Sequence, residues 1–135
     1  MASIALRFPG LPPSANKRLH HMERYRSNND WKGDAKQLAA DAVNRSKDGP
    51  FPWDLVHVHY LIHYPKRTKA DLDNMIGSCK PVLDGLSGVV FTDDSSQHVH
   101  RLSAEIVVQK GEPAGLIVSI TRCDRGSLHD ASLDN

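Results

Sequence analysis

The stretch that decides the fold of this chain is residues 69–94, which read KADLDNMIGSCKPVLDGLSGVVFTDD. Asp71 and Asp73 lie two positions apart near its start. Side chains alternate between the two sides of an extended segment, so this spacing predicts that both carboxylates point the same way. Leu72, between them, is predicted to point into the core. The stretch therefore begins with two carboxylates on one side of the chain.

The middle of the stretch has helical periodicity, and we predict one helix there. Its apolar residues recur three or four positions apart and would form a single buried face. These residues are Met75, Ile76, Cys79, Val82, Leu83 and Leu86. Asp73 or Asn74 is a suitable N-cap, and Pro81 is expected to bend the helix because it lacks an N–H. The outer face carries Lys80 and Asp84, one turn apart.

A second acidic pair, Asp93-Asp94, ends the stretch after an apolar run, 89–91, that we predict to be a short strand. The helix between the two acidic pairs is short enough for the chain to turn back and bring them together. Magnesium binds oxygen ligands, usually one or two carboxylates with waters and phosphates. The pattern therefore indicates a hard-cation site. The same residues also have a purely structural explanation, since Asp-x-Asp-Asn often caps a helix and Asp-Asp often forms a turn.

These motifs resemble those of the RusA family of Holliday junction resolvases. That family carries a D-x-D-N motif, a helix with a Leu-Asp-x-Leu segment, and a strand that ends in Asp-Asp. The corresponding segments here are residues 71–74, 83–86 and 89–94. The proline-rich start, 12–16, is similar too, and the resemblance covers roughly residues 3–122.

The resemblance implies a small homodimeric endonuclease that acts in DNA recombination and repair. Such an enzyme requires Mg²⁺, with Mn²⁺ left open as a substitute, and cuts paired strands of four-way DNA near the crossover. Carried over position by position, the catalytic carboxylates and metal ligands would be Asp71, Asp73 and Asp94. Asp93 is a lesser candidate.

One position departs from the family pattern. The family archetype has a Lys four residues after the second Asp of its motif, where this chain has Gly77. Lys80 lies three residues further along. Positions four and seven residues after Asp73 fall on the same helical face. We therefore predict that Lys80 is a catalytic residue that stabilises charge on a nearby phosphate.

Basic residues gather in the first half of the chain. Residues 1–69 hold 12 Lys and Arg against 6 Asp and Glu, whereas residues 70–135 hold 5 against 10. A basic half beside acidic residues is typical of a metal nuclease that contacts phosphates, although a solvated acidic surface is the alternative. Within residues 14–29, expected to be a loop, Tyr25 is a candidate to stack on an unpaired base. The predicted DNA-binding residues are Lys17, Arg18, Arg24, Arg26, Lys66, Arg67, Lys69 and Arg101.

The remaining patterns predict an α+β fold, in which two helices pack on a single-layer mixed β-sheet, RusA-like and in the order β-α-β-α-β-β-β. Asn29 or Asp30 is expected to cap the first helix, and 111–115 to form a hairpin loop. Strands are predicted at 3–8, 55–64, 89–91, 97–109 and 116–120, and helices at 31–45 and 75–86.

Three histidines, His57, His59 and His63, alternate along one face of the strand 55–64. Positions two apart on a strand lie about 7 Å apart, too far for one metal ion. We therefore expect these rings to pack under a helix or to meet solvent.

Length and composition bound the rest. A chain of 135 residues is expected to form one nuclease domain, 1–123, followed by a disordered polar tail, 124–135. The two cysteines lack metal-type spacing and are expected to be reduced thiols, as in a cytoplasmic protein. No long apolar run and no leader segment is seen, so no membrane partner is expected. A cytoplasmic location is therefore expected. The alternatives left open are a flap or fork nuclease and a non-catalytic DNA-binding protein on the same fold.

Overall fold

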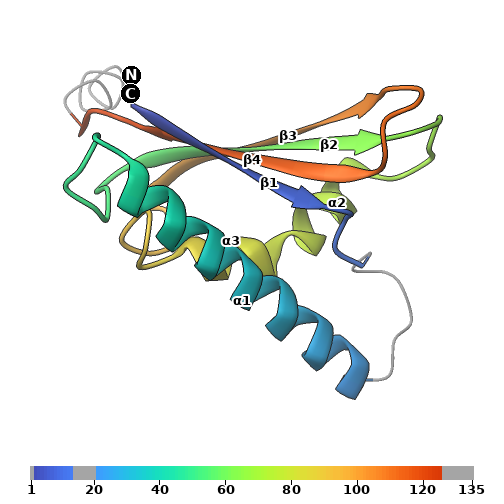
Figure 1. The fold of residues 1–135 in the computed structure, drawn as a ribbon, viewed down its shortest axis with the longest axis horizontal. Helices are drawn as coiled ribbons and strands as arrows, with labels where there is room; N and C mark the ends of the chain where they lie inside the picture. The colour runs from blue at the N-terminus through green and yellow to red at the C-terminus, as the bar shows by residue number, and fades with distance from the viewer. Residues whose placement is uncertain (1, 14–20, 126–135) are drawn as a thin grey trace, which may run out of the picture.

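The computed structural model describes residues 2–13 and 21–125, which form one four-stranded sheet with three helices on one of its faces (Figure 1). The predicted α+β class is confirmed. The elements in chain order are β1 (Ser3–Pro9), α1 (His21–Arg45), β2 (Val56–Tyr64), α2 (Leu72–Ser78), α3 (Lys80–Leu86), β3 (Val99–Val108) and β4 (Gly115–Arg122).

The strands lie in the order β1-β4-β2-β3. The last strand of the chain, β4, lies between the first two and pairs antiparallel with both, so that Ile4, Ile120 and Val58 are neighbours across three strands. β3 pairs with β2 in parallel. The prediction of a hairpin at 111–115 is therefore wrong, because β2 separates the two strands that this loop connects.

The core forms between the sheet and the helices, and the predicted alternation along three strands is confirmed. In β2 the inward residues are buried, and the same holds for alternate residues of β1 and β4. They are Val56, Val58, Tyr60, Ile62, Ile4, Leu6, Phe8, Leu116, Val118 and Ile120. α1 contributes Ala35 and Ala39, and its Trp31 lies against Phe8 with ring centroids 5.9 Å apart. Small residues on the helix let its backbone approach the core closely.

The first helix is longer than predicted. It begins at His21, so the loop expected for this segment and the caps at Asn29 or Asp30 are wrong. The reason is that residues 21–30 contain no buried side chain, and a helix without an apolar face leaves no periodic signal. The part of the expected loop at 14–20 lies outside the described residues, as do residues 126–135 of the expected tail.

The central stretch forms two short helices rather than one. The break falls at Cys79, and Pro81 lies in the first turn of α3, where its missing N–H costs no hydrogen bond. In place of the expected bend at Pro81, the chain thus has a break two residues earlier. The N-cap is Asp71 rather than Asp73 or Asn74. Because α2 already begins at Leu72, the alternation of side chains along an extended strand does not apply to this residue. Leu72 is 41% exposed instead of buried as predicted.

Residues 89–91 do not form the predicted strand. Phe91 makes isolated bridges to Trp53 and Ser87, and the Trp53 N–H donates to the Val90 carbonyl at 2.7 Å. Val90, Phe91 and Trp53 are all buried. Burial and two backbone contacts thus anchor this segment without a ladder, directly before the second acidic pair.

We expect the two cysteines to differ sharply in reactivity. Cys79 is fully buried, and burial raises the pKa of its thiol to about 12, so almost no thiolate exists at pH 8. Cys123 is only half-buried, so its thiol is more accessible than that of Cys79, although burial raises the pKa of this thiol as well. A thiol-specific reagent should therefore modify one thiol quickly in native protein and two after denaturation, and the Cys123→Ser variant should have no fast thiol. Two fast thiols in the native protein would contradict this packing.

Candidate functional site

Lys80 lies at the centre of a small charged cluster on α3. Its Nζ is 2.9 Å from Asp84 Oδ1, one turn along the helix, and it also forms an ion pair with Asp94 Oδ2. The hydrogen bonds that Lys80 donates to Asp94 and then to Asp84 raise the pKa of Lys80. The same contact with Lys80 lowers the pKa of Asp94. Lys80 and Asp94 are therefore both charged at neutral pH.

A hydrogen-bonded turn holds Asp94 against α3. The Ser95 N–H donates to Asp93 Oδ1 at 2.9 Å, and hydrogen bonds from the Ser95 side chain and then from this N–H lower the pKa of Asp93. The Thr92 N–H donates to the Trp53 carbonyl at 3.1 Å. Asp93 therefore has the turn-forming role that was the structural alternative for the Asp-Asp pair. Asp94 instead points to Lys80.

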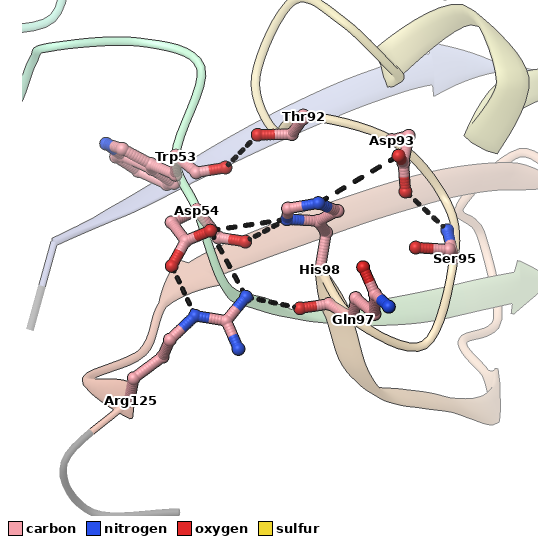
Figure 2. Close-up of polar contacts among 8 residues, drawn as sticks. All are labelled: Trp53, Asp54, Thr92, Asp93, Ser95, Gln97, His98 and Arg125. Atoms are coloured by element: carbon pink, nitrogen blue, oxygen red, sulfur yellow. Dashed lines mark hydrogen bonds and ion pairs between the residues drawn. The ribbon is translucent and has the colours of Figure 1, made fainter.

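A second set of polar contacts ties this turn to the start of β2 (Figure 2). His98 Nδ1 lies 2.6 Å from the Asp54 carbonyl oxygen, and its Nε2 lies 3.9 Å from Asp93 Oδ2. The Arg125 guanidinium pairs with the Asp54 carboxylate through Nε and Nη2. Its Nη2 also donates to the Gln97 carbonyl at 2.6 Å. The Arg125 guanidinium is the main reason that the pKa of Asp54 is lowered. Hydrogen bonds and ion pairs therefore connect the turn that carries Asp94 to Asp54, just before β2, and to Arg125, just after β4.

Asp54, His98 and Arg125 are not among the residues predicted from the sequence. Arg125 and Asp54 are 71 positions apart, and His98 and Asp54 are 44 apart. No local spacing connects such residues, because only the folded sheet brings them together.

The first acidic motif lies at the N-terminus of α2. Asp71 is the N-cap, and the Asp73 N–H donates to its Oδ1 at 3.1 Å. Both side chains are exposed. Asp71 therefore fulfils the structural role that the sequence left open, and an exposed carboxylate at a helix cap retains oxygen atoms that solvent or a ligand can reach.

The structure joins Asp94 to Lys80 and Asp84, while Asp71 and Asp73 stay at the start of α2. Within residues 2–13 and 21–125, no group of three or more His, Cys, Asp or Glu side chains is close enough to hold a metal ion. The convergence of Asp71, Asp73 and Asp94 on one cation therefore stays a prediction.

A polar groove of about 340 Å³ lies beside this cluster, between the N-terminal half of α1 and the junction of α2 and α3. Lys80 and Asp84 line one wall, and Arg24 and Tyr25 line the other. Of the predicted DNA-binding residues, Arg24 thus lies next to the charged cluster.

The other predicted DNA-binding residues are spread over the surface. Lys66, Arg67 and Lys69 are exposed in the connection that leads from β2 to Asp71. Arg26 is exposed on α1 and Arg101 on β3. Lys17 and Arg18 lie outside the described residues.

The histidine row on β2 does not pack under a helix, which was one of the two placements expected; its three rings are half-buried, and His57 and His59 contact β3. His59 Nδ1 lies 2.7 Å from Ser103 Oγ, and its Nε2 lies 3.0 Å from Glu105 Oε1. His57 stacks on His100 with ring centroids 5.4 Å apart, and burial lowers the pKa of His57. These rings belong to the sheet face opposite the helices.

Most of the chain matches one known protein family. Residues 9–121, which include both acidic motifs and Lys80, match the sequence profile of the family described as endodeoxyribonuclease RusA. The chain belongs to the RusA family. A search of curated protein sequences found no significant match. Membership of the RusA family implies an endonuclease that acts on branched DNA and resolves Holliday junctions. Among the described residues, none of the helices is long and apolar enough to cross a lipid bilayer.

Proposed function

We propose that this RusA-family protein is a magnesium-dependent endonuclease that resolves four-way DNA junctions by paired phosphodiester hydrolysis. The observation that carries the proposal is the family match over residues 9–121, since this range contains all three predicted carboxylates and Lys80. Asp71, Asp73 and Asp94 are the residues that would hold the metal ion.

The donor chemistry of these residues fits a hard cation. Each supplies carboxylate oxygens, the ligands that Mg²⁺ prefers, and Mn²⁺ accepts the same donors. Asp71 and Asp73 are exposed, and Lys80 keeps Asp94 ionised. When bound, such an ion lowers the pKa of a coordinated water and neutralises charge on the phosphate.

Lys80 supplies the second component of the proposed mechanism. Its ammonium group is held in place by Asp84 at 2.9 Å, so it stays positioned even when Asp94 binds another cation. A positioned ammonium group stabilises the negative charge that develops on the phosphate oxygens in the transition state. The basic residues that precede Asp71 would contact neighbouring phosphates and orient the DNA.

A two-fold symmetric dimer would place two such sites on opposite strands of the junction. Symmetry of this kind matches the pseudo-two-fold symmetry of a four-way junction and would account for paired cuts. Homodimer formation is part of the proposal.

The decisive experiment incubates purified protein with a synthetic four-way junction, a three-way junction, a flap and a linear duplex, with Mg²⁺, with Mn²⁺ and with EDTA. We expect paired nicks near the crossover of the four-way junction, only when a divalent ion is present. Equal cutting of flaps would favour a general branched-DNA nuclease. Tight binding with no cutting in either metal would overturn the proposal in favour of a non-catalytic DNA-binding protein.

A further inference from the structure

The N-terminal half of α1 has a sequence that core packing does not explain. It extends away from the sheet, and the only buried residues of the helix, Ala35 and Ala39, lie in its second half (Figure 1). Residues 21–30 have no buried side chain. This half of the helix is polar and lies outside the core, so its exposed surface is where a function would be found.

One stripe of this segment lines the groove beside Lys80. Its members are spaced by one, three or four positions and so lie on one helical face. They are Arg24, Tyr25, Asn28, Asn29 and Lys32. The groove volume, about 340 Å³, lies at the lower end of the range for small-molecule sites, which begins near roughly 300 Å³. The groove therefore has room for one small group rather than for a duplex.

The chemistry of the stripe matches the parts of a nucleotide. Tyr25 is 63% exposed, so its ring is available for stacking on a base. Asn28 and Asn29 carry amides that both donate and accept hydrogen bonds, as base edges require. Lys32 and Arg24 are cations suited to phosphate.

The opposite wall connects the groove to the proposed catalytic cluster. Lys80 and Asp84 line that wall, and Lys80 also pairs with Asp94. A nucleotide in the groove would therefore be adjacent to the residues assigned to hydrolysis.

We propose that this groove binds one unpaired nucleotide of the DNA substrate next to the cleaved phosphate, with Tyr25 stacked on the base and Asn28 and Asn29 at its edge. The inference rests on the proposed function, because it assumes a DNA substrate. It adds a site that distinguishes junctions, where bases can leave the stack, from uninterrupted duplex.

The test measures binding in EDTA, where no cleavage occurs, to four-way junctions that carry 2-aminopurine at single positions flanking the crossover. This base becomes brighter when it leaves the stack. We expect wild-type protein to change the fluorescence at one position. Tyr25→Leu should remove this change and weaken junction binding about 5- to 100-fold, in line with the contribution of one stacked base. Tyr25→Phe keeps the ring and should bind within about twofold of wild type.

Lys32 and Lys36 provide a matched pair of control variants. Both are exposed on α1 one turn apart, but only Lys32 lines the groove. Lys32→Ala should weaken binding and reduce the slope of log affinity against log salt by about one, whereas Lys36→Ala should change neither. Thermal melting of every variant should stay close to wild type, because these side chains are exposed.

Two outcomes would overturn the inference without touching the proposed function: wild-type protein cuts the junction and Tyr25→Leu binds and cuts equally well, or Tyr25→Phe loses as much binding as Tyr25→Leu. The reverse result is also distinguishable. If wild-type protein cuts no DNA but its binding depends on Tyr25 and Lys32, the groove assignment stands and the nuclease proposal fails.

Discussion

Replacing Asp94 with Asn should reduce cleavage of a four-way junction by about 100- to 1,000-fold, the usual cost of removing one preorganised charged or polar group from an active site. The amide cannot supply the charge of the carboxylate that Lys80 keeps ionised. Single-turnover cleavage rates in Mg²⁺ measure the loss. Junction affinity should be unchanged or higher, because a negative charge near the phosphates has been removed.

The fold should survive this substitution. The ion pair between Lys80 and Asp94 is solvent-accessible, and such pairs contribute about 0–1 kcal/mol to stability. Asp71→Asn should lose cleavage to a similar extent with junction binding intact or tighter, because the proposal assigns both carboxylates to one cation.

The neighbouring Asp93 is the matched control for Asp94. Its Oδ1 accepts the Ser95 N–H, a role that an Asn side-chain oxygen can also fill. Asp93→Asn should therefore cleave within about threefold of wild type. If Asp93→Asn loses cleavage and Asp94→Asn retains it, the assignment of the two carboxylates is reversed.

Gly85→Ala should destabilise the protein by about 3 kcal/mol, the upper part of the usual range for overpacking a core. A Cβ at this position would lie 2.4 Å from the Lys32 carbonyl oxygen and 2.8 Å from the Ala35 Cβ. One of these atoms is backbone and the other is a Cβ, so neither can move aside by a side-chain rotation and the two helices would have to separate. Thermal or urea unfolding followed by circular dichroism measures the change, and a melting temperature lower by roughly 10 °C is expected.

Gly33 on α1 is the control, because a Cβ there meets no atom within 4 Å. Gly33→Ala should stabilise the protein by about 0.5–1 kcal/mol, since Ala has the higher helix propensity. Wild-type stability of Gly85→Ala would show that α1 and α3 do not pack this closely in solution.

The sequence predicted the parts of the fold and the site that local chemistry controls. The inward faces of β1, β2 and β4 followed from alternation of apolar and polar residues, since a strand exposes successive side chains to opposite sides. An irregularity of the central helix near Pro81 followed from its missing N–H, although the break itself falls at Cys79. The acidic motifs and Lys80 were found because each is a short pattern within residues 69–94.

The N-terminal half of α1 shows the limit of this approach. Residues 21–30 are helical but bury nothing, so the hydrophobic period that identifies a helix is absent. The groove beside Lys80 was equally hidden, because its two walls come from segments about fifty positions apart.

Local periodicity and steric limits of the chain by themselves thus determined which residues of β1, β2 and β4 face the core, that the central helix is irregular near Pro81, and which carboxylates are candidates for chemistry. The tertiary structure alone decided that β4 lies between β1 and β2, that Asp94 pairs with Lys80, and that Asp54, His98 and Arg125 hold its turn. The physical reason is that these contacts join residues far apart in the chain, whose proximity depends on the packing of the whole sheet and its helices.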